Sequence, residues 1–305
     1  MNQENSKKIK EALRHVIAFF DMFDFPLTAF EIWKFCNQKS DLETVEKGLE
    51  DLVKNEKQLT VDRGMYFKNG REQIVEQRIQ RYNQADIKFQ RAIFVSRIFS
   101  LIPWIKFIAL GNVIGANNAK KESDIDLFIV SQNGRLWLTR FFCVLITIVL
   151  NLRPKINNAQ DKICLSFFVS EGFLNFRKIM LGEQDYYFAY WLSNIYPIYD
   201  SSNVYQKIIN ENFWIYDFFP NWFPVIANHK RRVKIFGSFF YRDVCDMLFG
   251  GLEKTIKKIQ IKIMPPAIRE IMNQDTRVII SDQILKMHVN DRRDYYNKKY
   301  VNQIF

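Results

Sequence analysis

The sequence has few cysteines and histidines, the residues that form the disulfides of secreted proteins and the metal sites of zinc fingers. Its 305 residues include only four cysteines and three histidines, and no CxxC or HxxxH pair occurs. Cys36, Cys143, Cys164 and Cys245 are widely spaced and lie mostly in apolar stretches, so no disulfide framework is visible and reduced, buried thiols are expected. The scattered histidines do not predict a zinc site either.

Long hydrophobic runs are also lacking. The first residues, MNQENSKKIKEALRH, are polar and charged where a signal peptide needs an apolar run, so we expect a cytoplasmic protein. The main membrane suspect, Phe141–Leu150, is well short of the roughly 20 residues that span a bilayer. We interpret it as a buried crossover helix, and a membrane partner is not expected. The alternative is that this helix and the basic C-terminal half lie on an anionic membrane surface.

Basic residues outnumber acidic ones. The sequence has 44 Lys and Arg against 33 Asp and Glu, which gives a formal net charge of +11. Such an excess of positive charge favours an anionic partner. The candidates are a nucleotide, a nucleic acid and an anionic membrane, and the charge does not choose between them. Hydrophobic residues make up 48% and charged residues 25%, values typical of folded globular proteins. A chain of this length is expected to form two or three compact units.

Residues 1–70 carry the pattern of a winged-helix-like unit. Pro26 and Thr28 supply a turn and an N-cap between two short helices, and the segment 41–55 places apolar residues on one helical face. A strand pair around a glycine turn follows in 58–70. Nucleic acid is therefore a possible partner, although the segment FEIWKFCNQ is poor in the arginines and paired amides that read base edges.

The remaining pattern predicts an α+β, or mixed α/β, fold. Residues 71–102 form a long connecting helix, and 103–200 alternate strands with a helix and indicate a small mixed β-sheet core. From Asn175 onward the periodicity is mainly helical, with prolines as breaks, so 201–305 are predicted to form a helical C-terminal region.

Asp124 and Asp126 are the most informative residues. Side chains alternate along a strand, so the two carboxylates are predicted on one face while Ile125 and Leu127 point into the core. Two adjacent negative charges are costly unless a cation lies between them, and carboxylate oxygens suit Mg²⁺ that carries a nucleotide phosphate.

The segment before this pair adds phosphate-binding features. Gly111 permits close backbone approach, and a helix predicted to start near Asn112 would direct its free N–H groups at phosphate oxygens. Lys120, Lys121 and Ser123 precede the acids and are expected near the same phosphates.

Gly111-Asn112 followed by Ser123-Asp124-Ile125-Asp126-Leu127 resembles the signature of the DNA polymerase β-like nucleotidyltransferase superfamily, which is Gly-Ser, a short helix, then Asp-x-Asp. The resemblance covers about Trp104 to Ser170. It implies Mg²⁺-dependent transfer of a nucleoside monophosphate from an NTP, with ATP as the first choice, to an acceptor hydroxyl. It also implies that Asp124 and Asp126 are the catalytic metal ligands and that Gly111, Asn112 and Ser123 contact the nucleotide.

The sequence departs from that signature in three places. Asn112 stands where the family has serine, and Gly115 comes one position earlier than the usual second glycine. The strand from Lys162 to Ser170 contains no acid, where the family places a third carboxylate, although Asp161 and Glu171 flank it. The alternative function is therefore a catalytically degenerate regulator or a DNA-binding module acting through the winged helix.

A second basic segment lies near the C-terminus. Arg292 and Arg293 in KMHVNDRRDYYNKKY belong either to an exposed basic helix or to a phosphate-gripping group.

Overall fold

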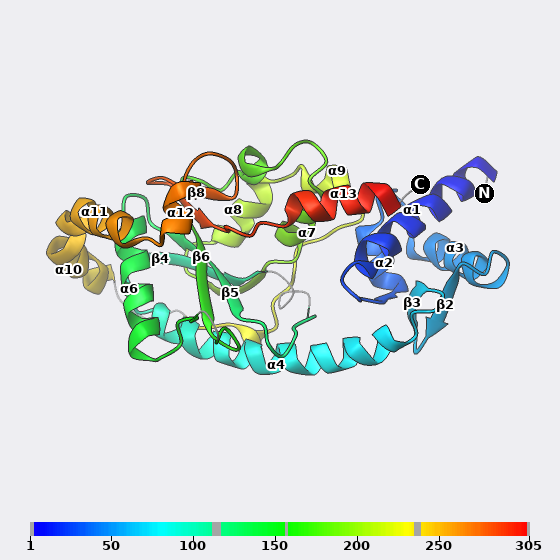
Figure 1. Cartoon of the computed structure of the whole chain (residues 1–305), viewed down its shortest axis with the longest axis horizontal. Coiled ribbons are helices and arrows are strands. Elements are labelled where there is room, and N and C mark those ends of the chain that lie inside the picture. The colour runs from blue at the N-terminus through cyan, green and yellow to red at the C-terminus, as the bar shows by residue number, and fades with distance from the viewer. Residues whose placement is uncertain (1–2, 112–116, 156–157, 235–238, 304–305) are drawn as a thin grey trace.

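A six-stranded mixed sheet forms the centre of the protein, and a small three-stranded sheet lies in the N-terminal part (Figure 1). The computed structural model describes residues 3–111, 117–155, 158–234 and 239–303. The expectation of an α+β fold is confirmed.

The N-terminal part has the predicted order of helices and hairpin. Its elements are α1 (Gln3–Asp21), β1 (Leu27–Thr28), α2 (Ala29–Phe35), α3 (Leu42–Lys54), β2 (Leu59–Asp62) and β3 (Met65–Lys68). Thr28 is the N-cap of α2, and it forms a capping box with Glu31. Leu13, Ile32 and Leu49 are fully buried in the core that these helices share. Whether this part acts as a winged helix stays a prediction.

Helix α4 (Gln73–Phe99) runs from the N-terminal part along the central sheet (Figure 1). Two arginines of α4 bind the N-terminal part. Arg78 forms an ion pair with Glu31 at 2.7 Å, and Arg81 donates to the backbone oxygen of Phe23 at 2.8 Å. Arg71, just before α4, pairs with Asp24 at 2.5 Å. These contacts link the helix to the unit that precedes it.

The central sheet has the strand order β7-β4-β5-β6-β9-β8. Strands β5 and β6 are parallel, and the other neighbours are antiparallel. The connection from β5 to β6 contains helix α6, as expected for a crossover. The strands are β4 (Ile105–Leu110), β5 (Ile125–Ser131), β6 (Ile163–Ser170), β7 (Tyr196–Asp200), β8 (Val278–Ile280) and β9 (Ile284–Met287).

Helix α6 (Leu136–Val149) agrees only partly with the prediction of a buried crossover helix. Trp137 and Cys143 in its first part are fully buried, whereas Val149 at its end is 74% exposed. Among the described residues, no helix combines the length and the apolar character that crossing a bilayer requires.

The prediction of a helical region after residue 200 is wrong in one respect, because β8 and β9 add two strands to the sheet from 278–287. Strand β7 was also missed, since Pro197 was interpreted as a break. Proline lacks a ladder donor and is tolerated in an edge strand, and β7 is the edge next to β4.

The remaining helices cover the sheet and close the molecule. Helix α13 returns to the N-terminal part, where Tyr300 meets Phe19 edge-on at 5.4 Å (Figure 1). The helices are α7 (Tyr186–Ser193), α8 (Val204–Glu211), α9 (Ile215–Phe218), α10 (Phe239–Phe249), α11 (Glu253–Ile263), α12 (Pro266–Glu270) and α13 (Arg293–Gln303).

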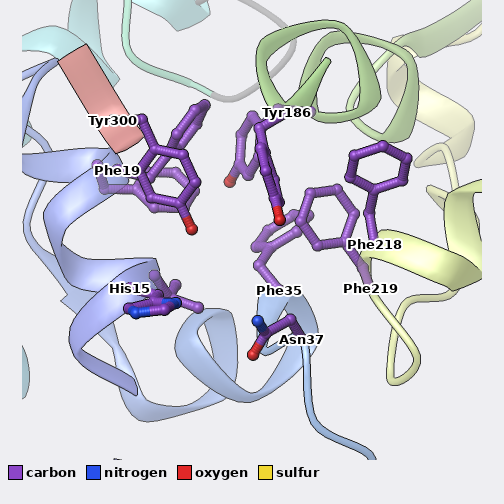
Figure 2. Close-up of a pocket in the computed structure, with 11 residues that line it drawn as sticks. His15, Phe19, Phe35, Asn37, Tyr186, Phe218, Phe219 and Tyr300 are labelled. Atoms are coloured by element: carbon purple, nitrogen blue, oxygen red, sulfur yellow. The ribbon is translucent and has the colours of Figure 1, made fainter. Parts of the chain in front are cut away.

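Side chains from distant segments meet where α1, α2, α7, α9 and α13 converge. Figure 2 shows His15 and Phe19 facing Tyr300, Tyr186 and Phe219 around this junction. The cavity between them is about 20 Å³, which is space for roughly one water molecule. The junction is therefore packing between the two ends of the chain rather than a ligand site.

Candidate functional site

Asp124 and Asp126 lie side by side at the start of β5, as the alternation predicts. Ile125 and Leu127 are buried in the core on one face of the sheet, while the two half-buried carboxylates face the other way. Oxygen atoms of both aspartates come within 4.8 Å of each other. Burial and the charge of Asp126 raise the pKa of Asp124 to about 6, as expected for two crowded carboxylates.

Cys164 completes this cluster from the neighbouring strand. It is the register partner of Asp126 in the parallel β5–β6 pair, and its Sγ lies within 4.8 Å of an oxygen of each aspartate. Burial and the two carboxylates raise the pKa of the Cys164 thiol well above its usual range, so the thiol is protonated at neutral pH. The strand that was expected to lack an acid therefore places a thiol beside the carboxylate pair.

Ser166 and His288 extend the site across the sheet. The Oγ of Ser166 lies 2.8 Å from Nε2 of His288 and 3.3 Å from Sγ of Cys164. His288 follows β9 directly, and β9 pairs with β6 through Phe167 and Lys286. Burial and nearby Lys286 lower the pKa of His288 to about 4, so its imidazole is neutral at pH 7.

These residues line a pocket of about 520 Å³, large enough for a nucleotide-sized ligand. One wall carries aromatic rings, where Tyr187 and Tyr296 stack with their ring centroids 5.3 Å apart. Trp191 of α7 forms another part of the lining and stacks on Phe167 at 5.3 Å. The pocket thus combines acidic, aromatic and basic surfaces.

The basic wall comes from β9 and the start of α13. Lys286 and Arg293 are almost fully buried and both pair with Asp291, at 2.7 and 2.9 Å. Arg293 also pairs with Asp185, the N-cap of α7, at 3.1 Å. These two cations are therefore neutralised by protein carboxylates. Burial, and then the nearby charge of Arg293, lower the pKa of Lys286 to about 8.

Arg292 differs from Arg293 although the two are adjacent in sequence. Arg292 is exposed and lines the pocket, and within the described part of the chain its guanidinium forms no ion pair. Among the described cations of this wall, Arg292 is the one whose charge is available to a ligand.

The predicted phosphate-binding residues have different places. Gly111 packs closely, because a Cβ there would lie 3.0 Å from Nε1 of Trp191, and its N–H donates to the backbone oxygen of Asp126 at 3.1 Å. Ser123 donates its hydroxyl to the backbone oxygen of Lys120 at 2.9 Å. Lys120 and Lys121 are exposed and are not among the residues that line the pocket. Asn112 and Gly115 lie outside the described residues, and 117–124 contain turns rather than helix.

Neither flanking acid joins the cluster. Asp161 forms ion pairs with Lys88 at 2.7 Å and with Arg91 at 3.1 Å. Glu171 follows the far end of β6, where its N–H donates to the backbone oxygen of Ser131. Since β5 and β6 are parallel, that end lies opposite to Asp124 and Asp126.

The comparisons with known proteins add no relative. No protein-family model, curated protein or solved structure matches the chain. A function for this protein is therefore inferred from the geometry of the pocket.

Proposed function

We propose that this protein is a nucleotidyltransferase that depends on a divalent cation and moves a nucleoside monophosphate from an NTP to an acceptor hydroxyl. The observation that carries the proposal is the pair Asp124 and Asp126, whose oxygens converge in a pocket of about 520 Å³. Two adjacent carboxylates are poorly stable without a counter-cation, and a metal–nucleotide complex supplies one.

Asp124 and Asp126 would hold the cation, which supplies Lewis acidity toward the reacting phosphate when bound. The two carboxylates fit Mg²⁺, as the resemblance to the polymerase β-like superfamily implies, whereas the Cys164 thiol beside them does not suit that ion.

Arg292 would bind the anionic end of the nucleotide. Its neighbours Lys286 and Arg293 already balance Asp291 and Asp185, so an added phosphate gains most from the exposed guanidinium. Arginine suits phosphate because its planar donors form paired charged hydrogen bonds. Tyr187 and Tyr296 offer flat apolar surface in the same pocket for the base or for the acceptor.

Transfer from an α-labelled NTP to a mixture of hydroxyl acceptors tests the proposal. Asp124→Asn and Asp126→Asn should each abolish transfer while retaining the shape of the side chain. Glu171→Gln is the matched control, because this acid belongs to the same sheet but lies at its opposite end. Transfer that survives both aspartate changes would remove the proposed roles.

A degenerate, nucleotide-binding regulator is the second candidate. The observation that favours it is the thiol of Cys164 at the position beside the carboxylates, where a third acid was expected. Equilibrium binding of an NTP without label transfer to any acceptor would support this candidate. Binding and transfer together would support the enzyme.

A further inference from the structure

The third donor of the cluster is sulfur rather than oxygen. Cys164 on β6 is the register partner of Asp126 on β5. The Sγ of Cys164 and one carboxylate oxygen from each aspartate all lie within 4.8 Å of one another. All three side chains are half-buried and line the same pocket. The donors come from two neighbouring strands, whose backbone hydrogen bonds fix their spacing.

This donor set disagrees with a site built for Mg²⁺. Magnesium takes oxygen ligands in near-ideal octahedral geometry, and a thiolate is a poor ligand for it. Among the described residues, the other carboxylate that lines the pocket is Asp291, which is already paired with Lys286 and Arg293. Within the described ranges, no third acid therefore supplies an oxygen donor to the cluster.

Softer divalent cations match the set. Zinc and cobalt accept carboxylate oxygen and thiolate sulfur together, and catalytic zinc sites commonly use three protein ligands and leave a position open. The affinity of a given site for divalent metals also rises from Mn²⁺ through Co²⁺ to Cu²⁺, and Zn²⁺ binds less tightly than Cu²⁺. Two carboxylates and one thiolate would balance more than the charge of one such ion.

We propose that Asp124, Asp126 and Cys164 form a site that prefers a thiophilic divalent cation of the Zn²⁺ or Co²⁺ class over Mg²⁺. This inference rests on the proposed function only in placing the nucleotide's cation at the same cluster. On binding, the S–H bond of Cys164 breaks, the proton passes to solvent, and the sulfur electron pair forms the bond to the metal. No oxidation or reduction takes place. The site keeps a coordination position for an oxygen of solvent or phosphate.

Cobalt binding to the purified full-length protein tests the preference. A thiolate bound to Co²⁺ gives a near-ultraviolet charge-transfer absorption that carboxylates do not give. We expect this band with the unaltered protein, and we expect Zn²⁺ to remove it at near-stoichiometric amounts while Mg²⁺ requires a large excess. Cys164→Ser should abolish the band and weaken Co²⁺ binding more than the about 10–100-fold typical of losing an outer-shell partner.

Two further variants make the test specific. Cys245→Ser should leave the band unchanged, because Cys245 lies on α10 and is not among the residues that line the pocket. Cys164→Asp should reduce the advantage of Zn²⁺ over Mg²⁺ at least about 10-fold, since it restores an all-oxygen set. This comparison uses direct metal titration, so it remains informative where Cys164→Ser folds poorly.

The outcomes separate this inference from the proposed function. A band that persists in Cys164→Ser, or equal displacement by Zn²⁺ and Mg²⁺, overturns the cation preference even where nucleotidyl transfer is observed. A band that depends on Cys164 in a protein that binds no nucleotide supports the metal site and removes the nucleotidyltransferase assignment.

Discussion

Lys88 of α4 forms an ion pair with Asp161 at 2.7 Å, and the same ammonium donates to the backbone oxygen of Ser123 at 2.6 Å. Lys88 is only 1% exposed, so this contact buries a full positive charge. Ser123 directly precedes Asp124, which means that one helix residue fixes the turn leading into the carboxylate pair. Asp161 was considered as a catalytic acid from sequence, and its position gives it this structural role instead.

Asp161→Asn should destabilise the protein by about 3–5 kcal/mol, because it removes the carboxylate that pairs directly with a buried ammonium. Asparagine is the suitable substitution, since residue 161 has a φ of 60°, which asparagine tolerates well. Lys88→Met should cost less, because Asp161 is 24% exposed and keeps Arg91 as a partner. Urea unfolding of both variants gives the comparison. Equal losses of unfolding free energy in the two variants would contradict the expectation that Lys88 depends on Asp161 more than Asp161 depends on Lys88.

The raised pKa of Asp124 predicts a stability that depends on pH. Below its ordinary value of 3.8 both folded and unfolded states hold the proton, so ionisation costs nothing. Between 3.8 and about 6 the unfolded state loses the proton first, so the free energy of unfolding falls as the pH rises, and the loss persists above about 6. Without divalent cations, Asp124→Asn should therefore gain stability over the unaltered protein across this window.

Thermal unfolding from about pH 4 to pH 8 checks the sign of this effect. A bound divalent cation should restore the lost stability above pH 6 in the unaltered protein and not in Asp124→Asn. If the melting temperatures of the two proteins differed by the same amount at every pH, the proposed crowding of the two carboxylates would be contradicted.

Local rules recovered much of this structure from sequence. The Thr28 cap, the helix 71–102 and the shared face of Asp124 and Asp126 follow from spacing along a single element. Strand β9 could not be found in that way, because its four residues belong to the sheet only through pairing with β6, more than a hundred positions earlier. His288 was hidden for the same reason, whereas Arg292 was a candidate from its basic segment but could not be told apart from Arg293. Cys164 lacked the second cysteine or histidine that usually marks a metal ligand.

Arg292 and Arg293 should behave in opposite ways although they are neighbours. Arg292→Gln should weaken NTP binding by about 10–100-fold without affecting stability, since a charged hydrogen bond contributes about 1.5–3 kcal/mol. Arg293→Gln should instead destabilise the fold by about 3–5 kcal/mol, because it leaves Asp185 and Asp291 buried with fewer partners. Calorimetric titration with an NTP and urea unfolding measure the two effects.

Arg269→Gln is the control for Arg292, because Arg269 is an exposed arginine on α12 and is not among the residues that line the pocket. It should change neither quantity. Similar losses of nucleotide affinity in both variants would indicate a general effect of net charge rather than a contact in the pocket.

Binding to duplex DNA through the N-terminal helices should be weak despite the charge of +11. The segment 220–223 covers α2, since Nδ2 of Asn221 donates to the backbone oxygen of Trp33 at 3.0 Å and Lys34 lies 4.4 Å from the ring centroid of Phe223. On α3, Lys47 is paired with Glu43 at 2.5 Å.

Affinity for a short duplex, measured against salt concentration, tests this expectation. A protein that neutralises many phosphates shows a steep loss of affinity with salt, because bound counterions are released. We expect a shallow slope here, which Lys34→Ala leaves unchanged, because the ammonium of Lys34 is engaged with Phe223. A steep slope that Lys34→Ala reduces by about one unit would instead place DNA against α2 and favour the regulator over the enzyme.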